Sequence, residues 1–181
     1  PMSLTYRGGA NGSISGDASQ TIDYNTDGTA VTAVPAAHHH FIDWSDGVTD
    51  ITRTDLAVID HLTVTANITI DTYSVNYVAG SNGSLSGNTD QVIDHGSDAT
   101  TVSGNPIEGY HFVDWSDGLD DNPRTDTNLI GPIAVIANFA INVYDLTYIG
   151  DANGSVSGDT AQAIDHGANG SAVTALPAAH Y

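Results

Sequence analysis

The sequence contains neither cysteine nor lysine among its 181 residues. Without cysteine there are no disulfides, no thiolate metal sites and no cysteine nucleophile. Without lysine, Schiff-base chemistry and Lys–Asn isopeptide cross-links within this segment are excluded as well. Disulfides and Lys–Asn cross-links therefore take no part in stabilising this segment.

Positive charge is almost as scarce. The only cations besides histidine are Arg7, Arg53 and Arg124, against 22 acidic residues, which gives a formal net charge of −19. Glu108 is the sole glutamate among these acids. Nucleic-acid binding and attachment to an anionic membrane both need clustered cations, so neither partner is expected. The charge suits a solvated surface in a salty or calcium-containing medium.

Long apolar runs are missing too. No run approaches the roughly 18 residues that a membrane-spanning helix needs, so no membrane insertion is expected in this segment. Hydrophobic residues make up 40% of the chain, which is enough for small cores. Since no signal peptide is visible, we expect the sequence to be a fragment of a longer protein.

What the chain does contain is an internal repeat. The motifs NGSISG, NGSLSG and NGSVSG begin at Asn11, Asn82 and Asn153, at intervals of 71 residues. The motif FIDWSDG, with Trp44, returns as FVDWSDG, with Trp115, at the same interval. Such a fixed period indicates tandem copies of one structural unit.

The period predicts two complete modules, residues 3–73 and 74–144, followed by a partial third module, residues 145–181. About two residues separate the last predicted strand of one copy from the first strand of the next. A connection of that length is too short to act as a flexible linker. We therefore predict an elongated, stiff rod in which each module has the neighbouring repeats as its partners.

Within one copy the pattern is that of β-structure, since no window shows a clean helical period. The Asn-Gly pairs lie between short alternating runs, which predicts a hairpin with a type I′ turn. The run 29–35 alternates and stops at a proline, and the run 40–44 alternates with Phe41 on the face opposite Trp44. One short helix or 3₁₀ turn has room within 49–60. The predicted fold class is mainly β, in small β-grasp-like or sandwich-like modules.

The longest alternating run ends each copy. From Leu62 to Ile70 the apolar residues occupy even positions, whereas beyond Ile70 the apolar residues Val75 and Tyr77 occupy odd positions. A shift of one residue exchanges the two faces of a strand. We interpret the change of phase after Ile70 as the boundary between modules.

Several motifs of the second copy occur in a fixed order after NGS-x-S-G: GYHF (109–112), WSDG (115–118), NPR (122–124) and ANF (137–139). This combination resembles the divergent internalin-type B-repeats, a family found in large bacterial surface proteins. The first copy departs from it, with AAHHHF before the tryptophan and Ile51-Thr52 in place of Asn-Pro. The resemblance covers nearly the whole chain. It implies compact β units that recur along adhesins and other surface proteins.

Trp44 and Trp115 admit two interpretations. Tryptophan faces stack on sugar rings, but a small module without disulfides also needs a large core anchor. One buried indole removes about 200 Å² from water, which stabilises a module by several kcal/mol. We predict that both tryptophans are core anchors.

Aspartates surround each tryptophan: Asp43, Asp46, Asp50 and Asp55 in the first copy, and Asp114, Asp117, Asp121 and Asp126 in the second. Glycoside hydrolysis needs two carboxyl groups facing each other across a cleft, and nothing in the sequence indicates one. DGVTD and DGLDD resemble a calcium loop but lack its closing glutamate, so calcium stays an alternative to solvated turns. For Arg53 and Arg124 we predict structural ion pairs with neighbouring aspartates.

The triplet His38-His39-His40 lies inside a repeat, and the second copy has Gly109, Tyr110 and His111 in its place. A zinc site built from all three imidazoles would be lost there, so we predict half-exposed strand residues and no metal ligands. No G-x-S-x-G elbow and no G-K-[ST] phosphate loop is present. The sequence therefore predicts no catalytic residue and no cofactor-binding residue.

Together these features predict a structural role rather than an enzyme. We expect a stiff acidic spacer or adhesin rod in a secreted or surface-anchored bacterial protein, located outside the cell. The alternative is a calcium-dependent or carbohydrate-binding adhesion module whose partner is a glycan or protein on a cell surface. A spacer needs only core and junction residues, whereas a binder needs exposed aromatic side chains.

Overall fold

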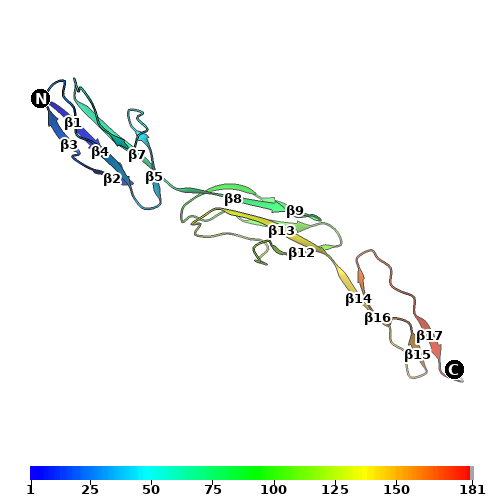
Figure 1. The fold of residues 1–181 in the computed structure, drawn as a ribbon. Coiled ribbons are helices and arrows are strands. Elements are labelled where there is room, and N and C mark those ends of the chain that lie inside the picture. Colours follow the sequence, from blue (N-terminus) through cyan, green and yellow to red (C-terminus); the bar gives the residue numbers. More distant parts are fainter. Residues whose placement is uncertain (180–181) are drawn as a thin grey trace. The chain divides into compact units, whose positions relative to one another are not determined.

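The computed structural model describes residues 1–179, so the last two positions of the partial module lie outside the described residues. The described residues form strands β1 to β17, arranged in several small sheets (Figure 1). They contain no helix, and hence none that could cross a membrane. The predicted all-β fold is confirmed, while the short helix allowed within 49–60 is not formed.

The first repeat is built from two sheets, whose orders are β3-β1-β7-β5 and β2-β4-β6. β1 and β7 run parallel, and the other pairs are antiparallel. The strands are β1 (Met2–Arg7), β2 (Gly12–Ser15), β3 (Ser19–Ile22), β4 (Val31–Pro35), β5 (His39–Trp44), β6 (Thr52–Arg53) and β7 (Leu62–Ile70).

The second repeat has the same arrangement, with the sheet β10-β8-β13-β12 and the pair β11-β9. An isolated bridge between Val102 and Arg124 replaces the β4–β6 pairing of Val31 with Arg53. The strands are β8 (Thr72–Ala79), β9 (Gly83–Gly87), β10 (Asp90–Asp94), β11 (Val102–Pro106), β12 (Tyr110–Trp115) and β13 (Ile133–Ile141).

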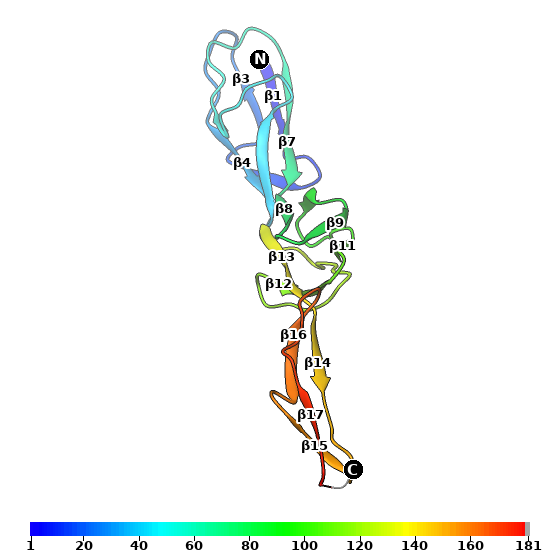
Figure 2. The same cartoon turned by 90° about the vertical axis from the view of Figure 1, so that its right-hand side faces the viewer.

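The partial repeat consists of two antiparallel pairs, β14 with β16 and β15 with β17 (Figure 2). These strands are the counterparts of the first four strands of a complete repeat. Their bounds are β14 (Val143–Thr147), β15 (Gly154–Ser157), β16 (Ala161–Asp165) and β17 (Thr174–Pro177).

The chain divides into two compact units. The first contains Pro1–Tyr73 together with Val92–Ser97 and Asn128–Gly131, and the second contains the remaining residues. The first unit therefore includes two short segments that belong, by sequence, to the second repeat.

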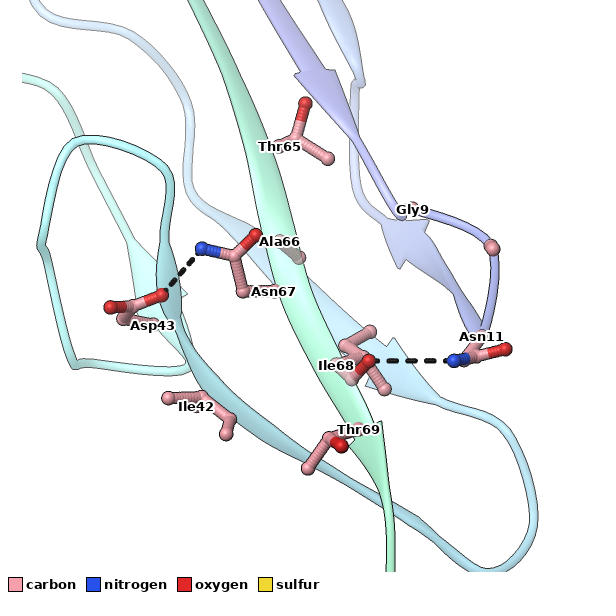
Figure 3. A pocket seen from close by; sticks show the side chains of 10 residues that line it. Gly9, Asn11, Ile42, Asp43, Thr65, Ala66, Asn67, Ile68 and Thr69 are labelled. Atoms are coloured by element: carbon pink, nitrogen blue, oxygen red, sulfur yellow. Dashed lines mark hydrogen bonds between the residues drawn. The ribbon is translucent and has the colours of Figure 1, made fainter.

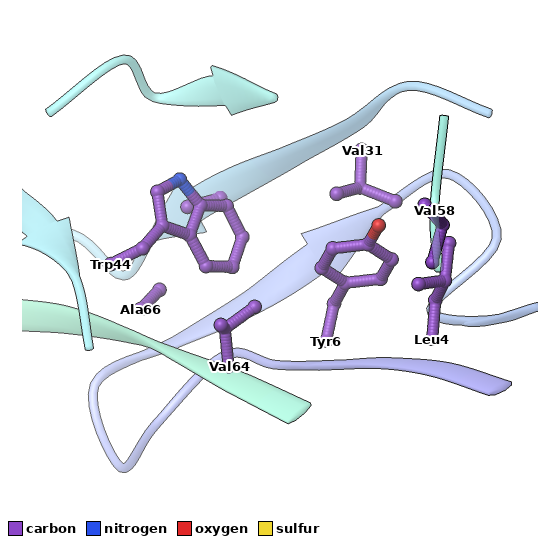
Figure 4. Packing of buried hydrophobic residues seen from close by; sticks show 8 residues of the cluster. Leu4, Tyr6, Val31, Trp44, Val58, Val64 and Ala66 are labelled. Carbon is purple, nitrogen blue, oxygen red and sulfur yellow. The ribbon is translucent and has the colours of Figure 1, made fainter. Parts of the chain in front are cut away.

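The core of the first repeat lies between its two sheets (Figure 4). Leu4 and Tyr6 on β1 face Val31 on β4, and Trp44 closes one end with no exposed surface. Tyr6 and Trp44 meet edge to face, with ring centroids 6.0 Å apart, a favourable geometry for aromatic pairs. The prediction that the tryptophans are core anchors is confirmed, because Trp115 is equally buried. The layered packing corresponds to the sandwich-like alternative.

The hairpin predicted at Asn11-Gly12 is wrong. β1 pairs with β3 and β7, whereas β2 pairs with β4, so the chain crosses there from one sheet to the other. A type I′ turn needs positive φ at both central residues. Of the three Asn-Gly pairs, only the one at Asn82 has its asparagine in that region, with φ 71°. The physical reason is burial: strands in opposite layers enclose a core that one hairpin leaves open.

The predicted alternation of run 40–44 is interrupted by a β-bulge. The pairing with β7 shifts register between Phe41 and Asp43, which leaves Ile42 exposed at the irregularity. An extra residue in a strand returns the next side chain to the same face. Phe41 and Trp44 therefore share the core face, with ring centroids 5.8 Å apart, instead of lying on opposite faces.

The phase change after Ile70 is a true boundary between strands. β7 ends at Ile70 and β8 begins at Thr72, so Asp71 alone connects them. Asn142 alone connects β13 to β14 in the same way. The alternating burial of β7 continues on β8 with the opposite parity, as the sequence predicted.

Candidate functional site

The most concentrated group of charges in the first repeat surrounds Arg53, at the end of β6. Its side chain is only 6% exposed. Nη1 and Nη2 each donate a hydrogen bond to the Asp46 carboxylate, both at 2.9 Å. Nε donates to Asp55 at 3.1 Å, and Nη2 bonds the same carboxylate. One guanidinium thus holds two carboxylates, each through two bonds, which is the strongest geometry available to an arginine.

Two aromatic rings complete this group. The Tyr6 hydroxyl donates to Asp55 at 2.6 Å, and the guanidinium carbon of Arg53 lies 5.3 Å from the Trp44 ring centroid. The indole Nε1 of Trp44 donates to the backbone oxygen of Asp50 at 3.0 Å. We call the five residues Tyr6, Trp44, Asp46, Arg53 and Asp55 the arginine clamp.

The second repeat contains the same clamp, formed by Tyr77, Trp115, Asp117, Arg124 and Asp126. Arg124 donates to Asp117 at 2.8 and 2.7 Å and to Asp126 at 2.8 Å from each of two nitrogens. The Tyr77 hydroxyl donates to Asp126 at 2.6 Å. The predicted ion pairs are confirmed. The sequence prediction missed the second carboxylate and the tyrosine, although Tyr6 and Tyr77 already kept the 71-residue step.

The clamps shift the pKa of their members so that the aspartates Asp46, Asp117 and Asp126 stay ionised and the tyrosines stay neutral. Hydrogen bonds from the arginines hold the pKa of Asp46 and of Asp117 below its usual range. Burial raises the pKa of Asp126, but hydrogen bonds from Arg124 and Tyr77 outweigh it and leave that pKa lowered. Burial, followed by the bond to Asp55, raises the pKa of Tyr6 well above its usual value. At neutral pH these groups keep their protonation states, so they do not fit acid–base catalysis.

The remaining aspartates that the sequence singled out lie outside the clamps and have separate partners. Asp43 Oδ1 accepts a hydrogen bond from Asn67 at 2.7 Å, and Asp114 accepts one from Asn138 at 2.8 Å. Asp50, like Asp121 in the second repeat, offers its backbone oxygen to the indole. The eight aspartates therefore do not converge on one position.

Among residues 1–179 there is no group of three or more His, Cys, Asp or Glu side chains that could hold a metal ion. The first aspartate of DGVTD and of DGLDD already binds an arginine. Both oxygens of Asp46 and both of Asp117 accept hydrogen bonds from a guanidinium. Calcium would have to displace a buried arginine to use them.

A groove of about 460 Å³ runs over the outer face of the first repeat, between the 9–11 loop and strands β5 and β7 (Figure 3). The Asp43–Asn67 pair lies in it, with Ile42 and Thr69 alongside. No aromatic residue is among those that line the groove. It therefore offers hydrogen-bonding groups but no ring for stacking on a sugar.

The three consecutive histidines turn to different partners. His38 lies in a turn with φ 60°, and its ring stacks on His95 with centroids 3.7 Å apart. His39 Nδ1 lies 2.8 Å from the Ala37 oxygen, and His40 Nδ1 lies 2.8 Å from an Asp71 carboxylate oxygen. The prediction of a half-exposed strand residue holds for His39, but His38 precedes the strand and His40 is exposed.

The single connecting residues are bonded on both sides. The Asp71 N–H donates to the oxygen of His38, and its oxygen accepts from the N–H of His95, both at 2.8 Å. Asn142 makes the equivalent bonds with Gly109 and His166, also at 2.8 Å. Each set of bonds lies within one compact unit.

Comparison with known families identifies the repeat. A family model described as the divergent InlB B-repeat domain matches residues 2–72 and again residues 73–143. Neither the curated proteins nor the solved structures give a match. Each matched range covers one complete repeat, together with the arginine clamp of that repeat.

Proposed function

The chain belongs to the divergent InlB B-repeat domain family, and on that premise we propose that it is a stiff, acidic spacer in a bacterial surface or secreted protein. Membership in this family suggests a repeat region of a bacterial surface protein. The spacer role is the more specific statement, and it rests on how the repeats use their polar and aromatic residues.

The observation that carries the proposal is the arginine clamp. In each complete repeat, the tryptophan, the arginine and the tyrosine that could serve a ligand are buried. The tyrosine and the arginine bond the same aspartate, and the guanidinium lies over the indole. Sites that bind ligands keep such groups convergent and accessible. A repeat that uses these three side chains to stabilise its own interior is suited to a structural role.

The short connections between consecutive repeats support a stiff spacer. One residue links consecutive repeats, and hydrogen bonds hold its backbone on both sides. A flexible linker needs several free residues, because its reach and freedom grow with its length. The net charge of −19 adds repulsion along the chain, which favours solubility and extension.

Spin labels test this proposal directly, since the chain has no cysteine to interfere. Ser13→Cys and Ser84→Cys place labels at equivalent exposed positions of the two complete repeats. A spacer predicts a single narrow distance distribution by double electron–electron resonance. The control pair, Ser13→Cys with Thr63→Cys inside one repeat, gives the width contributed by the labels. A distribution much broader than that control would refute the stiff spacer.

A carbohydrate- or calcium-dependent adhesion module is the second candidate. The groove with the Asp43–Asn67 pair favours it, because Asp114 and Asn138 repeat the pair in the second copy. A carboxylate beside an amide can bind sugar hydroxyls. A glycan array, run once with calcium and once with chelator, tests this candidate. Binding that Asn67→Ala together with Asn138→Ala abolishes would establish it over the spacer.

A further inference from the structure

Two stacked imidazole rings lie at the connection that follows the first repeat. The ring of His38, in the turn before β5, lies 3.7 Å from the ring of His95, with an angle of 7° between the two planes. His95 follows β10 and so belongs by sequence to the second repeat, although it lies in the first compact unit. The stack therefore fastens the 92–97 segment to the first repeat. Neither ring belongs to an arginine clamp, so the proposed spacer function leaves both without a role.

The backbone of His38 is strained. Its φ of 60° lies in the left-handed region, which glycine adopts freely and a residue with a side chain does not. The second repeat has Gly109 at this position, with φ 81°. The first repeat therefore retains a strain that glycine would relieve, and in exchange it gains the contact with His95. Strain that persists in this way is typical of a position with a function.

Titratable residues from the neighbouring elements surround the stack. The hydroxyl of Tyr73, on β8, lies 3.2 Å from Nδ1 of His95. The backbone of Asp71 joins the two histidines, since its N–H donates to the oxygen of His38 and its oxygen accepts from the N–H of His95. Asp94, at the end of β10, directly precedes His95 and is exposed. The fastening thus consists of one pair of rings and two backbone hydrogen bonds through Asp71.

Protonation changes the balance within the stack. Histidine is the side chain whose charge ordinarily changes between about pH 5 and pH 8. One charged ring against one neutral ring is tolerated, because a cation is attracted to an aromatic face. Two charged rings with centroids 3.7 Å apart repel each other strongly, because no solvent fits between them. A stack in which both rings carry a proton therefore opens.

A further histidine responds to acid in the opposite sense. Nδ1 of His40 lies 2.8 Å from a carboxylate oxygen of Asp71, and a proton on His40 strengthens that pair. The two side chains are 53% and 36% exposed, and an ion pair so accessible to solvent contributes little. Nδ1 of His39 faces the backbone oxygen of Ala37 rather than a charged group. The repulsion within the stack is therefore the larger effect of acid at this connection.

We propose that the His38–His95 stack is an acid-sensitive fastening, which holds the 92–97 segment on the first repeat at neutral pH and releases it between about pH 6 and pH 5. The second connection lacks this response. There the ring of His166 lies against Gly109, where an added Cβ would overlap it, so no second imidazole faces it from that position. Acid therefore loosens the first connection and spares the second. This regulation goes beyond the spacer role and does not depend on it.

Amide hydrogen exchange in the full chain, followed by NMR, tests the proposal. The N–H of His95 donates to Asp71, and the N–H of His166 donates to Asn142 in the same way, both at 2.8 Å. The two amides therefore form a matched pair within one molecule. After correction for the intrinsic exchange rate, protection of the His95 amide should fall by about fivefold or more between pH 7 and pH 5. Protection of the His166 amide should change by less than about twofold.

Three variants assign the response to the stack. His38→Gly installs the residue that the second repeat has, and His95→Phe keeps a ring that cannot take a proton, so each should abolish the loss of protection at position 95. His40→Gln removes the opposing pair and should leave that loss in place. Unchanged protection of His95 in acid, an equal loss at His166, or a loss that persists in both His38→Gly and His95→Phe would overturn the proposal. The spacer is tested separately, by the distance distribution at neutral pH.

Discussion

The guanidinium of Arg124 lies over the indole of Trp115, with its central carbon 5.4 Å from the ring centroid. The arginine side chain is 4% exposed and the tryptophan is completely buried. A cation desolvated to this degree must be neutralised by carboxylates, and Asp117 and Asp126 do so. Each clamp therefore depends on its arginine, because the loss of the guanidinium leaves both carboxylates without their counter-charge.

Replacing the clamp arginine should destabilise its repeat strongly. Arg124→Ala leaves the largely buried Asp126 without its counter-charge, and breaking such a pair from one side costs about 3–5 kcal/mol. Chemical denaturation followed by tryptophan fluorescence measures the loss. Arg7→Ala, at an exposed arginine of β1, is the control and should change the midpoint little. Equal midpoints for the two variants would contradict a structural role for the clamp.

Acid should weaken the repeats through the clamps. The pKa values of Asp46 and Asp117 are lowered in the folded state, mainly by hydrogen bonds from the arginines. A lowered folded-state pKa contributes stability above the unfolded value, about 3.9 for aspartate, and that stability is lost as pH falls through the folded value. The free energy of unfolding should therefore decrease below about pH 4.

Denaturant titrations between neutral and acidic pH measure this decrease. Asp43→Asn with Asp114→Asn is the matched control, since it removes two aspartates outside the clamps. That control should retain the decrease, whereas Asp46→Asn with Asp117→Asn should reduce it. An acid profile identical in both variants would show that the decrease has another origin.

High pH should lower the free energy of unfolding through ionisation of the clamp tyrosines, Tyr6 and Tyr77. Burial, and then the bonds to Asp55 and Asp126, raise the pKa of Tyr6 and Tyr77 above the ordinary value. A raised folded-state pKa contributes stability below the unfolded value, about 10, and that stability is lost as pH rises toward the folded value. Tyr6 and Tyr77 should therefore ionise late in an alkaline titration.

Ultraviolet absorbance of tyrosinate measures this late ionisation. Tyr6→Phe with Tyr77→Phe should remove the late-ionising fraction, whereas the control Tyr24→Phe, at an exposed position outside the clamps, should leave that fraction in place. If the double variant lost early-ionising groups instead, the buried hydroxyls would not be where the clamps place them.

Gly109 offers a test of the connection that follows the second repeat. It has φ 81°, and a Cβ at this position would overlap the ring of His166. Gly118 has a similar φ of 86° but open space around it. Gly118→Ala should therefore cost about 1–2 kcal/mol from backbone strain alone. Gly109→Ala should cost more and should also shift the NMR signals of His166, which the control should not affect.

Much of the architecture could be predicted from residue order. The 71-residue step predicted tandem repeats, and the exchange of even for odd apolar positions predicted a boundary after Ile70, where β7 ends. These predictions succeeded because burial on one face of a strand leaves a period of two in the sequence. Trp44 was predictable as a core anchor because a module of this size has few other large side chains.

Other features could not be predicted from local pattern. The Asn11-Gly12 pair favours a hairpin, yet β1 and β2 lie in different sheets because two layers bury more apolar surface than one. The bulge beside Ile42 depends on pairing with β7, some 25 residues away in the chain, so alternation within β5 alone could not reveal it.

The sequence by itself determined the repeat, its acidic character, the alternation of its strands and the pairing of an arginine with aspartate, because these depend on composition and on short-range order. Only the tertiary structure decided that Arg53 holds Asp46 and Asp55 together beneath Tyr6 and Trp44, and that β1 and β2 lie in different sheets. The physical reason is that both depend on which strands become neighbours, and strand pairing is settled by burial over the whole module rather than by any one segment.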